Sequence, residues 1–291
     1  KTFVVKVGGE VLTEPKIRRA LCEQIALLWS FSIRVVVVHG GGAELDAVCE
    51  AMNIPVEKVA GRRVTSPEVL DAAKMVFAGQ VHMDLLAELQ ASGVPAVGLT
   101  GLDAGLVKAH KRPPVAVVPD GATESQMVDF GLVGDIDTID PHVLSHLLEG
   151  GFVPVVAPLS GGEDGAIYNT NADTIAASLA TALGAEKLFF LLSVPGLLKD
   201  LKKASSLIPH ATLEELAGFE AKGIISGGMR PKLTAVKTAL QGGVPSAHLV
   251  SGLAPDALLA EVFTNEGSGT MIVPGIVPGI VPGLPVSAGT E

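Results

Sequence analysis

The sequence predicts an α/β fold in which helices cover both faces of a mostly parallel central sheet. Short apolar runs rich in Val, Ile and Leu alternate along the chain with longer segments whose apolar residues recur at helical spacing. Such alternation is typical of parallel sheets, because two parallel neighbours need a crossover helix between them. The 291 residues are 48% hydrophobic but only 4% aromatic, which suits closely packed layers of small aliphatic side chains.

The N-terminal half shows this alternation from its first residues. Residues 2–7 form a β-branched run, and residues 33–42 carry four consecutive valines before three glycines. An apolar run without polar alternation indicates a strand buried on both faces. Pro113-Pro114 argues against a central strand at 106–118, where we expect an edge strand or hairpin. The remaining elements that we expect here are helices at 15–30, 44–52, 66–92 and 142–151 and strands at 94–101 and 152–159.

The C-terminal half repeats the pattern and then ends in a repeat of its own. Val-Pro-Gly recurs three times within residues 273–284, and this tripeptide favours turns over a packed core. We therefore expect residues 274–291 to be a flexible tail without a catalytic role. Before it, the pattern predicts helices near 172–183, 212–218, 229–241 and 255–263 and strands at 187–192, 247–252 and 269–273.

Bulk properties disfavour several classes of function. The formal net charge is −10, whereas nonspecific nucleic-acid binding depends on a surplus of Lys and Arg. No apolar run reaches the roughly 18–20 residues of a membrane span, and the N-terminus lacks a signal peptide. Cys22 and Cys49 lie in expected helices and show no metal-ligand spacing, so we expect reduced thiols and a cytoplasmic protein.

Three glycine-rich turns follow expected strands, at Gly8-Gly9, at Gly40–Gly42 and between Gly98 and Gly101. Glycine permits close approach of the backbone, so its N–H groups can face an anion beyond the carboxyl end of a strand. A single such turn is equally well explained as a tight connection, but several together favour a phosphate or carboxylate site. The P-loop pattern and the dinucleotide pattern G-x-G-x-x-G are both missing.

A few basic residues lie where an anion would meet them. Lys6 ends the first expected strand, and a lysine in a buried strand is costly unless it is paired with a negative charge. Lys232 lies near the start of an expected helix, whose dipole also favours anions. Arg62-Arg63 precede another helix. Each of these residues alone is more simply explained as a solvated surface residue.

Asn169, Asn171 and Asp173 are spaced two apart at the entrance to the expected helix 172–183. On an extended approach the two asparagines share one face, and Asp173 falls in the first helical turn. Either Asn171 simply caps the helix, or the three polar residues line a site.

The order of motifs along the chain decides between these interpretations. It resembles the amino acid kinase family over about residues 3–273, which is nearly everything except the repeats. The stretch AIYNTNADTIAASLA, residues 166–180, carries the most specific similarity. The motifs read VVKVGGEVL, VVVVHGGGAELD, GRRVTSPEVL, GLTGLDAG, GGEDGAIYNTNADTIAASLATALGAEK, VPGLL, GIISGGMRPKLTAV and GSGTMI.

This resemblance implies a three-layer αβα sandwich with two lobes. Residues 1–166 would bind the amino-acid substrate and form a homodimer, and residues 167–273 would bind the nucleotide. The implied reaction is ATP-dependent phosphorylation of the side-chain carboxylate of N-acetyl-L-glutamate, which yields an acyl phosphate in arginine biosynthesis. Mg²⁺ would be held mainly by the nucleotide phosphates, with no metal ligands assigned to the protein.

The resemblance also assigns roles to individual residues. It implies that Lys6 and Lys232 stabilise the transferring phosphoryl group and that Asp173 orients both lysines. Such a reaction needs no general base, because the acceptor carboxylate is already ionised at neutral pH. The substrate would be bound by Gly41, Gly42, Arg63, Asn169 and Asn171, and the phosphoryl group and nucleotide by Gly8, Gly9, Ser193, Val194, Pro195, Gly196, Leu197, Leu198, Ile224, Ile225 and Ser226.

Two departures from the family pattern matter. Ser193 stands where the family usually has an aspartate before Val-x-Gly, which puts the affinity for ATP in doubt. His248, Glu261 and Gly267–Gly269 resemble part of the arginine site of hexameric members, but the chain begins directly at its first strand, without their N-terminal helix. We therefore expect a dimer with little inhibition by arginine.

Two alternatives remain at this point. The first is a kinase for aminoadipate or glutamate linked to an acidic carrier protein, which Lys108, Lys111 and Arg112 would meet on the expected hairpin. Turnover of free N-acetylglutamate would argue against it, whereas activity only with a supplied carrier would favour it. The second is an amino-acid sensor of the same fold that has lost its chemistry. Ser193 is its support, whereas the two lysines and Asp173 argue against it.

Overall fold

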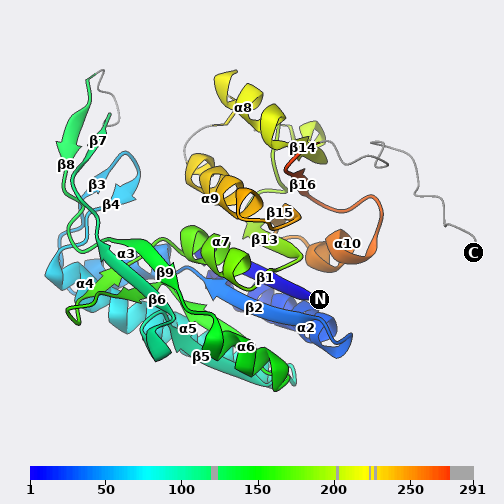
Figure 1. Ribbon diagram of the computed structural model, residues 1–291, viewed down its shortest axis with the longest axis horizontal. Helices are drawn as coiled ribbons and strands as arrows, with labels where there is room; N and C mark the ends of the chain where they lie inside the picture. Colours follow the sequence, from blue (N-terminus) through cyan, green and yellow to red (C-terminus); the bar gives the residue numbers. More distant parts are fainter. Residues whose placement is uncertain (119–123, 201–202, 223, 226–227, 276–291) are drawn as a thin grey trace, which may run out of the picture.

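The computed structural model describes residues 1–118, 124–200, 203–222, 224–225 and 228–275. The expected repeat tail therefore lies almost wholly outside the described residues, and so does Ser226. Figure 1 shows one sheet running through both halves of the chain, with helices packed on its two faces. The expected α/β class and mostly parallel sheet are confirmed. The division into two lobes at residue 166 stays a prediction.

The first strand lies in the interior of the central sheet. Within the described residues, eight strands pair in the order β14-β16-β15-β13-β1-β2-β10-β5, and all neighbours are parallel except β15 and β16. In the sheet, β1 lies between β2, which follows it along the chain, and β13, which comes from the C-terminal half. The strands are β1 (Thr2–Val7), β2 (Arg34–His39), β5 (Ala96–Thr100), β10 (Val153–Ala157), β13 (Lys187–Leu192), β14 (His210–Thr212), β15 (Ser246–Ser251) and β16 (Thr270–Val273).

Alternate residues of β1 face two different hydrophobic cores, because successive side chains of a strand point to opposite faces. Phe3, Val5 and Val7 pack into one core, whereas Val4 packs into the other. Lys6 shares the face of Val4 by this alternation. The first core contains residues of α1 (Gly9–Thr13), α2 (Pro15–Ser30), α3 (Gly42–Ala51), α4 (Pro67–Met75), α5 (Val81–Ala91) and α10 (Ala257–Phe263); the second contains residues of α6 (His142–Glu149), α7 (Ala172–Ala182), α8 (Leu213–Ala221) and α9 (Met229–Gln241).

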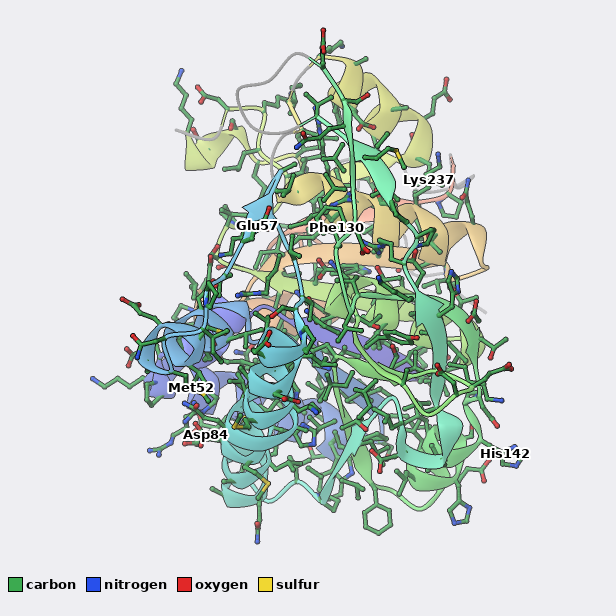
Figure 2. All side chains as sticks on the ribbon, turned by 90° about the vertical axis from the view of Figure 1, so that its left-hand side faces the viewer. Met52, Glu57, Asp84, Phe130, His142 and Lys237 are labelled. Atoms are coloured by element: carbon green, nitrogen blue, oxygen red, sulfur yellow. The ribbon has the colours of Figure 1, made fainter. Side chains whose placement is uncertain are left out.

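Several helices begin where the sequence supplies a start signal. Ser66 caps α4 by accepting a hydrogen bond from the Val69 N–H, and Pro67 occupies the first position of that helix. Thr212 and Glu215 form a reciprocal capping box at the start of α8. Of the side chains labelled in Figure 2, Phe130 is buried and the others are exposed.

The segment 106–118 differs from the expectation. It holds two strands that do not pair with each other: β6 (Val107–Lys111) pairs with β9 (Gly134–Ile139), and β7 (Val115–Val117) pairs with β8 (Gln126–Val128). β6 lies in the interior of a small sheet of order β12-β11-β6-β9, because the two prolines fall after its last residue and cost it no hydrogen bond. That sheet also contains β11 (Leu159–Gly161) and β12 (Ile167–Asn169), and a separate hairpin joins β3 (Lys58–Val59) to β4 (Arg62–Arg63).

The single helix expected at 66–92 is continuous but not uniform. A π-helical turn, Val76–Gln80, joins α4 to α5. Short 3₁₀ turns occur at Asp103–Gly105 and Ala204–Ser206. The expected helix at 15–30 and strands at 2–7 and 187–192 match α2, β1 and β13.

Candidate active site

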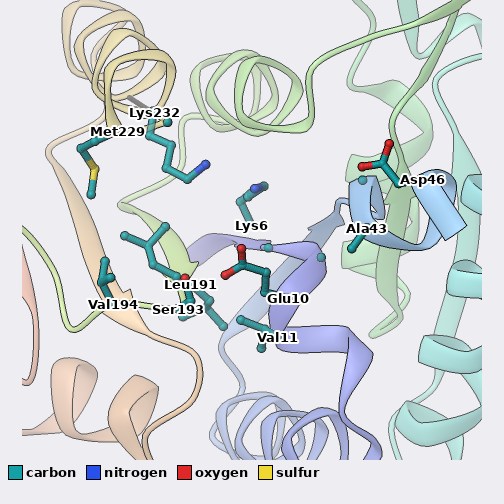
Figure 3. Close-up of a pocket in the computed structure, with 15 residues that line it drawn as sticks. Lys6, Glu10, Val11, Ala43, Asp46, Leu191, Ser193, Val194, Met229 and Lys232 are labelled. Carbon is teal, nitrogen blue, oxygen red and sulfur yellow. The ribbon is translucent and has the colours of Figure 1, made fainter. Parts of the chain in front are cut away.

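A cavity of about 510 Å³ opens at the carboxyl ends of β1 and β13. The central strand β1 has β2 as its neighbour on one side and β13 on the other, so the strand order changes direction at β1. Ligands of open α/β sheets bind at such switch points. The volume lies within the usual range of small-molecule sites. Figure 3 shows the lining side chains, and the cavity is lined by Lys6, Gly8, Gly9, Glu10, Val11, Gly42, Ala43, Asp46, Leu191, Leu192, Ser193, Val194, Gly228, Met229 and Lys232.

Two lysines from distant parts of the chain meet one aspartate at this cavity. Lys6 Nζ lies 2.7 Å from Asp173 Oδ1, and Lys232 Nζ donates a hydrogen bond to Asp173 Oδ2 at 3.1 Å. Figure 3 shows the two lysine side chains reaching toward each other from opposite sides of the cavity. The geometry follows from the elements: Lys6 is on the face of β1 that α7 covers, Asp173 is in the first turn of α7, and Lys232 is in the first turns of α9.

Burial and mutual charge set the ionisation of this cluster. The side chains of Lys6 and Asp173 are only 7% and 6% exposed. Burial lowers the pKa of Lys6 below that of an ordinary lysine, although the Asp173 carboxylate opposes this. Burial alone would raise the pKa of Asp173, but the two ammonium groups outweigh it and hold that pKa below the usual range. With both lysines in the ammonium form, the cluster has two positive charges against the one negative charge of Asp173, which leaves a net positive charge for an anion.

Backbone N–H groups converge beside the lysines. Gly9 begins α1 and Gly42 begins α3, so both helices direct their amino ends into the cavity. A Cβ atom on Gly9 would lie 3.4 Å from the amide nitrogens of Gly41 and Gly42, so a side chain there would fill the space between the two helix starts. Gly8 is fixed by its own N–H, which donates to the Leu191 carbonyl at 3.2 Å. This arrangement is suited to a phosphate or carboxylate group.

The N–H groups of Gly9, Gly41 and Gly42 form what we call the anion cradle. Arg63 lies beside this cradle. Its guanidinium donates to Asp46 Oδ1 at 2.6 Å and to the Gly42 carbonyl at 2.9 Å. Asp46 also accepts a hydrogen bond from Lys58 at 2.8 Å, so it ties α3 to both strands of the β3–β4 hairpin. Burial raises the pKa of Asp46, but its two basic partners outweigh this and hold the pKa below the usual value. Arg63 keeps further N–H groups for a ligand carboxylate.

The two asparagines are placed differently from each other. Asn171 Oδ1 accepts hydrogen bonds from the N–H groups of Asp173 and Thr174, so it caps α7 and fixes the turn that carries Asp173. Asn169 ends β12, and its amide donates to Thr65 Oγ1 at 3.1 Å. Neither side chain lines the cavity.

The expected nucleotide-binding residues divide into two groups. Ser193 and Val194 line the cavity, whereas Leu197, Leu198 and Ile225 are buried in the protein. Gly196 and Leu197 form a loop beside Thr270, whose hydroxyl accepts a hydrogen bond from the Leu197 N–H at 2.9 Å. Pro195, Gly196 and Ile224 do not line the cavity either.

Sequence reasoning missed several lining residues. Glu10 and Val11 follow the first glycine pair in α1, and Gly228 and Met229 precede Lys232 at the start of α9. The sequence could have indicated that these four residues line the cavity, because each lies within a few positions of a residue assigned to the site. Asp46 ends the motif VVVVHGGGAELD, but no role was assigned to it, because its contacts depend on the hairpin that brings Lys58 and Arg63 to it.

His248 and Glu261 form a separate buried network. His248 Nδ1 lies 2.6 Å from Glu261 Oε1, and Glu261 Oε2 accepts hydrogen bonds from the N–H groups of Ser268 and Gly269. The network ties α10 to β15 and to the loop before β16. In the part of the chain that the structure describes, no helix is long and apolar enough to cross a membrane.

The fold and the site together define a phosphotransferase of the α/β class, with a cationic cradle at the switch point of the sheet. The family model described as the amino acid kinase family matches residues 1–251, and the chain belongs to that family.

Within this family, the chain is similar to proteins named acetylglutamate kinase. The chain is 67% identical over 273 residues to an acetylglutamate kinase of Myxococcus xanthus (strain DK1622), and the match covers 94% of the chain and 89% of the relative. It is 42% identical over 271 residues to an acetylglutamate kinase of Desulfitobacterium hafniense (strain DSM 10664 / DCB-2), covering 93% of the chain and 90% of the relative.

Solved structures share the fold. N-acetylglutamate synthase from Neisseria gonorrhoeae, complexed with coenzyme A and N-acetyl-glutamate, superposes with a TM-score of 0.79 at 28% identity, over 95% of this chain but 60% of that one. Carbamate kinase from Giardia lamblia bound to AMP-PNP gives a TM-score of 0.67 at 18% identity, over 94% of this chain and 99% of that one. The latter likeness concerns the fold alone.

Proposed function

We propose that this protein transfers the terminal phosphoryl group of ATP to the side-chain carboxylate of N-acetyl-L-glutamate, the acetylglutamate kinase reaction of arginine biosynthesis. The observation that carries the proposal is the convergence of Lys6 and Lys232 on Asp173 in a cavity lined by helix N-termini. The 67% identity to an acetylglutamate kinase over nearly the whole chain supports the choice of substrate.

The proposed reaction brings two anions together, the substrate carboxylate and the ATP phosphates, which repel each other. Positively charged groups held in the site reduce this repulsion. The substrate carboxylate is already ionised, so no base is needed to activate it. Lys6, Lys232 and the N–H groups of Gly9, Gly41 and Gly42 stabilise the negative charge on the transferring group. Asp173 keeps the ammonium groups of both lysines in place before the substrates arrive.

The nucleotide would lie on the β13 and α9 side of the cavity, beside Ser193, Val194 and Met229. Ser193 offers a hydroxyl rather than the carboxylate usual in the family. Both oxygens of Asp173 are committed to lysines, and among the described residues no group of three or more His, Cys, Asp or Glu side chains is placed to hold a metal. We propose that Mg²⁺ arrives with the ATP phosphates, where it would neutralise part of their charge.

The amino-acid substrate would lie on the α3 side of the cavity. Arg63 already holds one carboxylate, that of Asp46, and its unused N–H groups suit the α-carboxylate of the substrate. Asn169 lies next to Thr65 on the same side and is a candidate donor. For Asn171 a substrate contact is the weaker proposal, because its oxygen caps α7.

We further propose that the protein is a homodimer joined through its N-terminal half. Met75 and Met83 are 51% and 61% exposed on α4 and α5, where large apolar side chains are available to a second copy. Light scattering that gives the mass of one chain in dilute solution would contradict this.

The carrier-protein alternative has less support, because two of its three basic residues are paired with acidic side chains. Lys111 pairs with Asp129 at 2.9 Å, and Arg112 pairs with Asp135 at 2.6 Å, whereas Lys108 is exposed on β6. The sensor alternative fits poorly with a buried aspartate that holds two lysines at a cavity.

A hydroxamate assay of acyl-phosphate formation tests the proposal. The acceptors to compare are N-acetylglutamate, glutamate, aspartate and N-acetylaminoadipate, each with ATP and Mg²⁺. We expect the highest kcat/KM with N-acetylglutamate. Activity that appears only with a carrier-linked acceptor, or binding of amino acid without acyl-phosphate formation, would overturn the proposal.

A further inference from the structure

Two histidines lie buried against each other behind the cradle, and the proposed chemistry does not use them. His39 ends β2 and is fully buried, and His82 in α5 is 6% exposed. His39 Nε2 and His82 Nδ1 are 2.8 Å apart. Neither residue lines the cavity. Polar groups buried in an apolar core are costly unless each finds a partner, so the pair calls for an explanation.

The hydrogen bonds define which ring nitrogens carry protons. His39 Nδ1 lies 2.8 Å from the carbonyl oxygen of Gly40, which can only accept, so this nitrogen carries the proton. Burial lowers the pKa of His39 to about 4, so the ring is neutral at physiological pH and its Nε2 is an acceptor. The proton between the two rings therefore belongs to His82 Nδ1. The chain of donors runs from His82 to His39 to the Gly40 carbonyl.

This chain of hydrogen bonds fixes the plane of one peptide. The described residues contain no cis peptide bond, so the Gly40 carbonyl and the Gly41 N–H point in opposite directions. Holding the carbonyl toward His39 holds the Gly41 N–H on the other side, where the Gly41 and Gly42 nitrogens flank the space beside Gly9. The Gly40 N–H is fixed as well, because it donates to the Val7 carbonyl at 3.0 Å.

The position of His82 is fixed by close packing. A Cβ atom on Gly98 of β5 would lie 2.3 Å from His82 Nε2, so only glycine leaves room for the ring against the sheet. The ring therefore has little freedom to turn away from His39.

We propose that His39 is a positioning residue which, with its tautomer set by His82, aims the Gly41 N–H at the reacting anion. The proposal rests on the proposed function, since the anion is the carboxylate and phosphoryl group of that reaction. A preorganised donor of this kind stabilises the transition state more than the bound substrate, so its loss appears in kcat.

A matched pair of amide substitutions tests the proposal. In His39→Asn the side-chain NH₂ takes the place of Nδ1 and still donates to the Gly40 carbonyl. In His39→Gln the amide reaches only the place of Nε2, where it contacts His82 and leaves the carbonyl without its donor. We expect kcat within about 5-fold of the wild type for His39→Asn and a fall of about 30-fold or more for His39→Gln, with little change in the KM for ATP.

Leu85→Ala is the control for a merely structural effect. Leu85 is fully buried on the same helix as His82, so this change lowers the melting temperature without touching the Gly40 peptide. We expect its kcat to stay within about 3-fold of the wild type at a temperature where it is folded. Equal kcat values for the Asn and Gln variants, or a Gln variant that loses only stability, would overturn the proposal. A wild-type protein inactive on N-acetylglutamate would instead overturn the proposed function.

Discussion

Asp173 precedes Lys232 by 59 residues in the chain, yet its Oδ2 atom accepts a hydrogen bond from the Lys232 ammonium group at 3.1 Å. The other carboxylate oxygen lies 2.7 Å from Lys6. One buried carboxylate thus holds apart two ammonium groups, of which one comes from β1 and the other from α9. The proposed reaction depends on that spacing.

Asp173→Asn tests whether the carboxylate organises the two lysines. Asparagine keeps the shape of the side chain but not its charge, so the lysines repel each other without a counter-charge. We expect a folded protein whose kcat in the hydroxamate assay is reduced at least about 100-fold. Asp137→Asn is the control, because Asp137 is half-exposed and pairs only with His110 among the ion pairs described. A kcat within a few-fold of the wild type would remove Asp173 from the mechanism.

The pH dependence of kcat/KM reports the ionisation of Lys6. The ammonium form is the active one, so activity falls as the pH rises through the pKa of Lys6. Burial lowers that pKa, so the alkaline limb should begin below the value of an ordinary lysine. Asp173 raises the pKa of Lys6, so the residual activity of Asp173→Asn should have its alkaline limb at still lower pH. A limb that moves to higher pH in this variant contradicts the assigned electrostatics.

Gly9→Ala tests the cradle formed by the two helix starts. The added methyl group would lie 3.4 Å from the amide nitrogens of Gly41 and Gly42 and 3.3 Å from a Glu44 side-chain oxygen. The backbone tolerates it, but the space for an anion is filled. We expect kcat to fall about 10- to 100-fold with an unchanged melting temperature. Gly218→Ala, in open space within α8, should leave kcat unchanged and raise the melting temperature slightly, because alanine is the better helix former. Full activity of Gly9→Ala would exclude anion binding at this point.

Arg63→Lys tests the assignment of the substrate carboxylate. A single ammonium group cannot hold Asp46, the Gly42 carbonyl and a ligand carboxylate in the fork geometry of a guanidinium. We expect the KM for N-acetylglutamate to rise about 10-fold or more, with kcat changed only a few-fold. The exposed neighbour Arg62 provides the control variant Arg62→Lys. If both variants keep the wild-type KM, Arg63 does not bind the substrate.

Much of the fold was predictable because its signals are local. The valine run of β2 and the helical periodicity of α2 each lie within one segment, and Ser66-Pro67 marks a helix start by itself. β9 was missed, since its sequence GDIDTI contains glycine and two aspartates, which are rare in strands, and its pairing with β6 is a long-range feature. The pairing also explains why the prolines after β6 were misread as evidence for an edge strand.

The site was predictable only where motif order assigned residues. Composition alone could not show that Lys6, Asp173 and Lys232 meet, because the contact depends on β1, α7 and α9 packing together. His82 lies in no motif, and Asp46 lies at the end of the motif VVVVHGGGAELD without an assigned role. Their positions follow from a hairpin folding back on α3 and from a helix packing against Gly98.

The most direct test of the central claim is the kcat for acyl-phosphate formation in Lys6→Ala, Lys232→Ala and the double variant. The account predicts that each single change lowers kcat at least about 100-fold in a folded protein, and that the second change costs much less than the first, because the two groups act as a unit. Near-normal turnover in either single variant would contradict it.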